Sequence, residues 1–423
     1  MKAFWWSKDH VTQSASYPKS RLGHSFTYMP ERDVYILYGG LFNKPEVIYL
    51  YSSRSFKWSE QQTKGKMPQL TRFHWAWYEE PHFFVMGGET EKKKINDIYW
   101  LNFETLMWRK LFVFEPPLPR YQHAISKVER ENTIILFGGC AQQLMNDLWE
   151  LDLSSWNYKG KSDIPGAVWS CLSQKGDIPT VRRGHKLVKF PALNKLVLYG
   201  GYTVQNNDLL SNHDPNIYVL DIKSLIWSKL KLEGDLPKPK ALHSMNFFSI
   251  NKLIIIGGIL AEPKDEEEKE WETFMVDFKI NKISKPFIAN TSPSSRYGHS
   301  SASNDNPKEP QLLWIGGMDI TDTNARTYWS MEPFRLLYHD VEEETKFQKH
   351  SEGAKLVEEV KGSIKVSNKK ILENNKLLNE LENEVISISA KNAKKNRQVN
   401  KLVSEIDELG TKKLNMVKTL ESK

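Results

Sequence analysis

The sequence has 423 residues, of which 26% are charged and 39% are hydrophobic. It holds 14 Trp, 16 Tyr and 19 Phe, more than a disordered chain carries, so a large part of it can bury a core. Two Cys exclude a disulfide scaffold and a Cys-rich zinc protein. The chain has no run of 18 apolar residues and no secretory signal at its start. We therefore expect no membrane insertion and a cytoplasmic location.

The net charge is +7, from 59 basic and 52 acidic residues, and the excess is spread thinly along the chain. A nucleic-acid-binding protein normally carries a basic cluster or stripe. We therefore expect protein partners and no nucleic acid.

The composition changes abruptly near residue 340. Every Trp lies between Trp5 and Trp329, the last Pro is Pro333, and no Trp, Tyr or Pro follows residue 340. The change predicts two parts, the first rich in turns and aromatic residues and the second an uninterrupted helix.

A Gly-Gly pair recurs six times, and each pair follows a short run of apolar and aromatic residues. Such runs, closed by glycine, are typical of buried strands. The pairs are spaced 48 to 62 residues apart, which indicates a repeat architecture. The pairs are Gly39-Gly40, Gly87-Gly88, Gly138-Gly139, Gly200-Gly201, Gly257-Gly258 and Gly316-Gly317.

A histidine lies 13 to 17 residues before each pair, and a basic residue lies two or three positions before each histidine. A second strand-like run follows each pair, with a tryptophan after it in several copies, as at Trp58, Trp108 and Trp227. The histidines are His24, His74, His123, His185, His243 and His299. The basic residues are Arg21, Arg72, Arg120, Arg182, Lys240 and Arg296.

This order of residues resembles the kelch repeat, whose period is about 50 residues. The resemblance covers residues 1–338 in six copies, although the first lacks the usual Asp before Tyr49 and the fifth has Ile283 in place of the Trp. It implies an all-β, six-bladed kelch β-propeller, in which each repeat forms a four-stranded blade around a central channel. The run Arg326–Trp329 is expected to be the third strand of the last blade.

The last blade also needs a fourth strand to close the ring. Trp6-Ser7-Lys8 matches Trp227-Ser228-Lys229, so we expect the N-terminal segment to supply this strand. Residues 335–339 are a competing source for the same strand.

Two alternatives remain for the six basic residues. In kelch propellers, equivalent arginines can line a pocket for a partner peptide, which implies a cationic ring at one mouth of the channel that suits carboxylates. The structural alternative is that each side chain pairs with a local carboxylate or carbonyl and locks its own blade. The six histidines, spread around a ring, are expected to serve structural hydrogen bonding.

A long loop after Gly258 carries the acidic run Asp265, Glu266, Glu267 and Glu268. The run is a candidate docking site for a basic surface, or simply a solvated loop. The sequence has no HExxH, P-loop or GxSxG motif, and Cys140 and Cys171 are best explained as inert buried thiols. We expect no enzyme, no catalytic residue, no metal site and no cofactor.

The last part of the chain repeats apolar residues with a period of seven, which predicts an α-helical coiled coil over residues 355–423 after a linker at 339–354. Val and Ile at one core position and Leu at the other favour a parallel dimer, although a heteromer or a single helix on the propeller would use the same stripe. The expected seam comprises Ile364, Ile371, Leu378, Leu381, Val385, Ile388, Val399, Leu402, Ile406 and Leu409.

Together the two parts predict a non-enzymatic scaffold or adaptor. The propeller face and loops would bind a partner protein, and the coiled coil would dimerise the chain or dock it in a cytoskeletal, ciliary or axonemal, or trafficking assembly. The alternatives are a substrate receptor of a ubiquitin ligase and an enzyme built on the propeller.

Overall fold

A computed structural model gives the fold of the chain, which divides into two units, Met1–Asp340 and Val341–Lys423. It describes residues 2–9, 17–40, 47–128, 133–154, 156, 167–190, 193–205, 208–211, 214–260, 272–288, 293, 296–304, 312–319, 331 and 333–340. The expected coiled coil with its seam, the acidic run at 265–268, the run at 326–329 and all but the first two residues of the expected linker lie outside the described residues.

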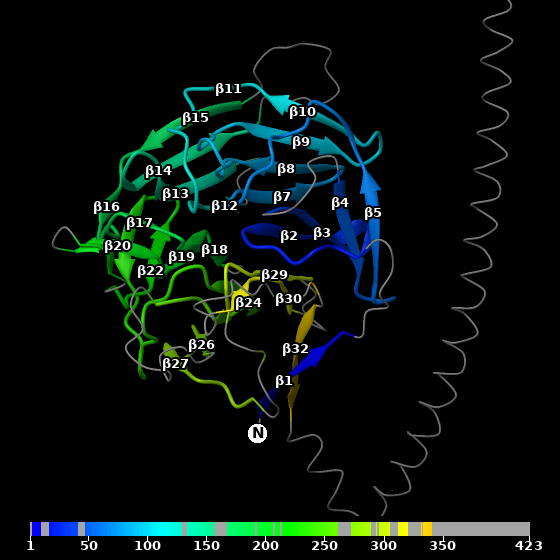
Figure 1. The fold of residues 1–423 in the computed structure, drawn as a ribbon. Helices are drawn as coiled ribbons and strands as arrows, with labels where there is room; N and C mark the ends of the chain where they lie inside the picture. Colours follow the sequence, from blue (N-terminus) through cyan, green and yellow to red (C-terminus); the bar gives the residue numbers. More distant parts are fainter. Residues whose placement is uncertain are drawn as a thin grey trace, which may run out of the picture. The chain divides into compact units, whose positions relative to one another are not determined.

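Six antiparallel sheets stand around a common axis as the blades of a propeller (Figure 1). Blade 1 consists of β2 (His24–Met29), β3 (Val34–Gly39), β4 (Val47–Ser52) and β5 (Lys57–Gln62), with a short 3-10 turn, η1 (Pro30–Arg32). Blade 2 consists of β7 (Trp75–Glu79), β8 (His82–Met86), β9 (Ile98–Asn102) and β10 (Met107–Leu111). Blade 3 consists of β12 (Ala124–Val128), β13 (Thr133–Cys140), β14 (Leu144–Asp152) and β15 (Ala167–Leu172).

The other three blades repeat this order. Blade 4 consists of β18 (Lys186–Phe190), β19 (Lys195–Tyr199), β22 (Tyr218–Asp221) and β23 (Ile226–Lys229). Blade 5 consists of β24 (Ser244–Ser249), β25 (Lys252–Ile256), β26 (Thr273–Asp277) and β27 (Lys282–Ser284). Blade 6 consists of β29 (Ser300–Ser303), β30 (Leu312–Ile315), β32 (Phe334–Asp340) and β1 (Lys2–Lys8).

Blade 6 takes strands from both ends of this unit. β32 pairs with β30 as the third strand, and β1 pairs with β32 as the outermost strand, with Trp6 opposite Leu336. The N-terminal segment and residues 335–339 therefore lie side by side and do not compete for one place. The third strand is not the run at 326–329, because β32 already occupies that position beside β30.

Short accessory strands complete the described sheets. Three of them run parallel to the fourth strand of a blade: β6 (Lys64–Gly65), β11 (Val113–Phe114) and β16 (Lys175–Gly176). The others join a segment that carries a ring cation to the chain after a Gly-Gly pair. β17 (Arg182–Arg183) pairs with β20 (Tyr202–Gln205), and β20 also pairs with β21 (Asp208–Ser211). β28 (Arg296–Tyr297) pairs with β31 (Met318–Asp319).

The core consists of six clusters, one between each pair of neighbouring blades. Second strands are apolar on both faces because each blade is covered on both sides; β8, for example, is buried along its whole length. Outer strands alternate instead, and they bury a tryptophan such as Trp169 or Trp227 in the gap between blades. This arrangement explains why the tryptophans recur with the repeat.

Candidate functional site

A ring of backbone hydrogen bonds surrounds the channel at one end. In each blade, one residue directly precedes the repeated histidine. Its backbone N–H donates to the carbonyl of the corresponding residue in the preceding blade, over 2.7–3.3 Å. All six residues have positive φ. They are Gly23, Phe73, Gln122, Gly184, Leu242 and Gly298.

The first glycine of a Gly-Gly pair packs against the histidine of the next blade. A Cβ on Gly200 would lie 2.3 Å from the carbonyl oxygen of Lys240 and 2.7 Å from Cε1 of His243. Gly200 also has a φ of +72°, which side chains rarely adopt. Only glycine satisfies both requirements, so the pair marks the points where neighbouring blades touch.

The six repeated histidines are buried, with 0–7% of their surface exposed. Burial lowers the pKa of His74 to about 4, and it lowers the pKa of His243 to about 3 with help from the nearby Lys186 and Lys240. The imidazoles are therefore neutral at physiological pH, and His185 Nε2 lies 3.2 Å from the carbonyl of Phe137 in the preceding blade. His74 Nε2 likewise lies 3.0 Å from the Ser25 hydroxyl oxygen of the preceding blade, so structural hydrogen bonding is seen at these two histidines.

Except for Arg72, the six basic residues lie inside the blades and not on the surface of the mouth. Four of the arginines donate from Nη1 to the carbonyl of the first glycine in their own repeat, over 3.0–3.3 Å. These four side chains, Arg21, Arg120, Arg182 and Arg296, are 1–2% exposed, and Lys240 is 6% exposed.

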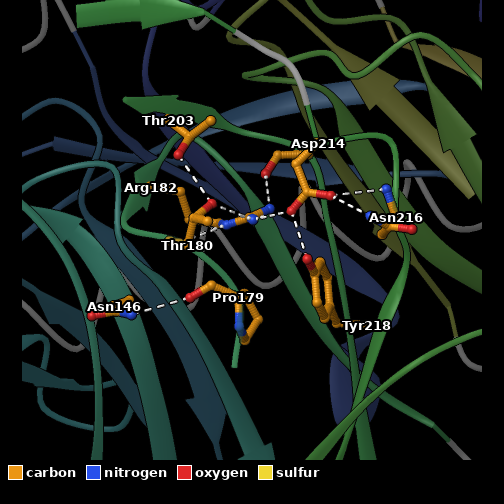
Figure 2. A network of polar contacts seen from close by, with 9 residues as sticks. Asn146, Pro179, Thr180, Arg182, Thr203, Asp214, Asn216 and Tyr218 are labelled. Atoms are coloured by element: carbon orange, nitrogen blue, oxygen red, sulfur yellow. Dashed lines mark hydrogen bonds and ion pairs between the residues drawn. The ribbon is translucent and has the colours of Figure 1, made fainter. Parts of the chain in front are cut away.

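Local carboxylates complete the pairing of these cations. Arg120 forms a two-pronged ion pair with Asp147, at 2.6 and 2.8 Å. Figure 2 shows the equivalent network in blade 4, where Arg182 bonds Asp214 and the hydroxyl of Thr180.

Blades 5 and 2 use different pairs. Lys240 pairs with Glu272 at 3.0 Å. Arg72, whose side chain is 38% exposed, pairs with Glu89 at 2.8 Å. The contacts of the buried Arg120 and Arg182 favour the structural alternative, because donors already bonded within a blade are not presented to a partner.

In blades 3 and 4, the residue that follows the ring cation is half-buried and lies at the mouth. Tyr121 follows Arg120, Arg183 follows Arg182, and both precede a residue of the backbone ring. The Arg183 guanidinium lies over the ring of Tyr121 at 5.5 Å and over the ring of Tyr202 at 5.6 Å. Its Nη1 also donates to the Tyr121 hydroxyl.

Two further aromatic residues extend this group. The ring of Phe73 lies 6.5 Å from that of Tyr121, and Tyr297 precedes Gly298 of the backbone ring. Burial, together with the neighbouring Tyr297, raises the pKa of Tyr202 to about 12, so its hydroxyl keeps its proton. We call these half-buried residues the mouth surface: Phe73, Tyr121, Arg183, Tyr202 and Tyr297.

The sequence interpretation selected the buried cations and missed the mouth surface. The available signal was adjacency: Arg183 directly follows Arg182, and Tyr121 directly follows Arg120. Strand alternation could have distinguished the two sets, because neighbouring residues in an extended segment point to opposite sides.

The channel behind the backbone ring has a narrow and a wide part. The narrow part is a cavity of about 70 Å³, lined by the backbone ring and the histidines. The wide part is a cavity of about 820 Å³, lined by the innermost strands of the blades. Five residues line both parts: His24, His74, Trp75, Lys186 and Ser300.

Metal sites, membrane-spanning helices and the cysteines concern the described part of the chain. Among those residues, no group of three or more His, Cys, Asp and Glu side chains could hold a metal ion. The same residues contain no helix long and apolar enough to cross a membrane. Both cysteines are free; Cys171 is exposed and Cys140 half-buried, so neither is the fully buried thiol that was expected.

Six four-stranded blades, each with a histidine against a Gly-Gly pair, define the chain as a kelch-type propeller. The protein family described as "KLHDC2/KLHL20/DRC7 Kelch-repeats domain" matches this chain over residues 1–167 and 161–358. The chain therefore belongs to this kelch-repeat family, whose propellers typically bind other proteins.

Three curated relatives show more distant similarity. Host cell factor of Drosophila melanogaster is 27% identical over 64% of this chain, and host cell factor 2 of Homo sapiens is 25% identical over 67%. Tip elongation aberrant protein 1 of Schizosaccharomyces pombe is 30% identical over 45% of the chain. The aligned regions cover 18%, 38% and 16% of these relatives, so the chain spans well under half of their length.

Proposed function

We propose that this chain is a non-enzymatic scaffold whose propeller binds a partner protein across the mouth surface. The observation that carries the proposal is that the Arg183 guanidinium lies over the rings of both Tyr121 and Tyr202. Tyrosine and arginine are enriched among the residues that dominate binding energy at protein interfaces. Here they are already held in one geometry, so a partner would lose little side-chain entropy by binding them.

The rigid wall beneath these side chains supports the same proposal. Tyr121 and Arg183 each lie one residue before a member of the backbone ring, which ties neighbouring blades together. A binding surface on such a scaffold keeps its shape without the partner, which favours affinity.

We further propose that residues 355–423 form a coiled coil that dimerises the chain or joins it to another helix. A dimer would present two mouth surfaces, and their combined avidity would exceed the affinity of either alone. The name of the Schizosaccharomyces pombe relative refers to tip elongation. From the combination of a propeller with a coiled coil, we propose for this scaffold a cytoplasmic assembly linked to the cytoskeleton, with a cilium as one setting.

Affinity capture from cells that express the chain tests the mouth surface. The wild-type chain is compared with Arg183→Ala by quantitative mass spectrometry, and Arg109→Ala is the matched control. Arg109 is exposed on β10 and lies over Trp100 at 5.4 Å, so it reproduces the stacking away from the mouth. We expect a set of proteins that Arg183→Ala loses and Arg109→Ala keeps; an identical set for all three would contradict the proposal.

A further inference from the structure

Lys186 brings a cation into the middle of the channel. It is the first residue of β18 and lines both the narrow and the wide cavity. Its ammonium nitrogen lies 5.8 Å from the centre of the Trp75 ring. The corresponding residues of the other blades, directly after the histidine, are uncharged: Ser25, Trp75, Ala124, Ser244 and Ser300. One blade therefore breaks an otherwise neutral ring.

Carboxylates of the described residues lie elsewhere in the channel. The residues that line the narrow cavity include no Asp or Glu. Those of the wide cavity are Glu31, Glu79 and Glu80, of which Glu79 ends β7 and pairs with Lys127 at 3.1 Å. Glu79 is four residues from Trp75 along the strand, about 13 Å at the usual rise. The acidic groups thus lie at the far end of the channel from Lys186.

The channel wall offers further hydrogen-bonding groups. The six innermost strands are each the edge of their sheet, so one row of their backbone N–H and C=O groups has no partner strand. The volume of the wide cavity, about 820 Å³, lies within the range of ligand-binding clefts. An extended segment of polypeptide could therefore enter the wide part and bond along the wall.

We propose that Lys186 anchors a carboxylate-binding site inside the channel, and that its ligand is a carboxylate on an extended protein segment entering from the wide end. Among the described residues no carboxylate lines the narrow cavity beside this ammonium, so an incoming carboxylate would be its first charged partner among them. The site lies inside the channel, whereas the mouth surface lies beyond the backbone ring, so it does not depend on the proposed function.

The electrostatics of the channel agree with this assignment. Burial lowers the pKa of Lys186 to about 8, since the protein offers little compensation for its charge. The charge of Lys186 acts on three nearby titratable groups, the imidazoles of His24, His243 and His299. Burial and nearby cations lower the pKa values of these histidines. They are neutral at pH 7 and neither neutralise Lys186 nor compete for an anion.

The test measures the Lys186 pKa in the full chain by NMR of lysine labelled with ¹³C at Cε. The Lys186 signal is assigned from its loss in Lys186→Met. The probes are a Gly-Gly-Glu-Gly-Gly peptide blocked at both ends, the same peptide with Gln, and sodium acetate. Lys189→Met is the matched control, because Lys189 lies on the same strand and lines only the wide cavity.

We expect the Glu peptide to raise the Lys186 pKa by about 1 unit or more, since a neighbouring carboxylate favours the ammonium form. The Gln peptide should have no effect, acetate should act only at higher concentration, and Lys189→Met should respond as wild type does. An unchanged Lys186 pKa with every probe would overturn the site. Acetate as effective as the peptide would overturn the protein segment as its ligand.

Discussion

The backbone N–H of Gly23 donates to the carbonyl of Gly298 over 3.3 Å, and this bond joins the first repeat to the last. It is one of six equivalent bonds, so the ring is closed by the same interaction that links every other pair of blades. The second closure is the pairing of β1 with β32 in blade 6. Segments from the two ends of this unit, far apart in sequence, are thus held together by local, repeated geometry.

Glycine at the blade contacts is required for two separable reasons. Gly200 and Gly184 both have positive φ, but a Cβ on Gly200 would meet backbone at 2.3 Å, whereas one on Gly184 would meet only the Leu242 side chain at 3.2 Å. We expect Gly184→Ala to cost about 1 kcal/mol and Gly200→Ala about 3 kcal/mol or more. Urea denaturation measures both; equal costs would contradict the close-contact explanation.

The backbone conformation at the position of Gly184 supports the smaller cost expected for Gly184→Ala. Phe73, Gln122 and Leu242 adopt the same backbone conformation at the equivalent position, with φ of 54–55°. A side chain is therefore compatible with this part of the backbone ring.

Stability should fall as the pH drops below about 6.5. The folded pKa values of the buried histidines lie below the unfolded value, at about 4 for His74 and about 3 for His123 and His243. Between these values and 6.5 the unfolded chain binds more protons, so acid favours unfolding by up to about 1.4 kcal/mol per pH unit for each histidine. Urea denaturation at pH 7.5, 6.5 and 5.5 checks this, and His243→Asn should reduce the slope. A free energy of unfolding that stays constant down to pH 5.5 would contradict it.

Asp9 links the N-terminal strand to blades 1 and 6. Its Oδ2 accepts from the Tyr51 hydroxyl at 2.6 Å and from Arg335 at 3.1 Å, and only 4% of Asp9 is exposed. Asp9→Ala should cost about 2–4 kcal/mol, because it removes the carboxylate that pairs with the largely buried guanidinium of Arg335. Arg54→Ala is the control, since Arg54 pairs with Asp33 while its own side chain is 81% exposed. Thermal denaturation should separate the two variants, and similar melting temperatures would argue against this link.

The oligomeric state tests the proposed coiled coil. Light scattering coupled to size exclusion should give twice the chain mass for the full chain and a monomer for residues 1–340. A monomeric full chain would rule out the homodimer. A dimer of residues 1–340 would show that the propeller, and not the coiled coil, forms the dimer interface.

Much of the propeller could be predicted because its signals repeat. Six Gly-Gly pairs and six histidines mark contacts that recur in every blade, so one repeat supports the interpretation of another. Blade 6 was harder, because its third and fourth strands come from distant parts of the sequence and Phe334–Asp340 carries no Gly-Gly signal.

The candidate site was less predictable for a physical reason. Repetition identifies residues that hold blades together, and Arg120 and Arg182 belong to that group because each donates to a glycine carbonyl in its own repeat. Residues that face a partner differ from blade to blade. Arg183 and Lys186, which we propose to bind ligands, each occur in one blade only, so a search for repeated positions does not find them.

The adjacent residues Arg182 and Arg183 give the most direct test of the account, in which Arg182 stabilises its blade and Arg183 binds a partner protein. Arg182→Ala should destabilise the propeller by about 3 kcal/mol or more, because Asp214 loses its buried partner. Arg183→Ala should leave the melting temperature nearly unchanged and remove captured partner proteins. The decisive measurement compares the two variants in melting temperature and in the amount of partner protein that each captures. Partner loss with Arg182→Ala at unchanged stability, together with full capture by Arg183→Ala, would contradict the account.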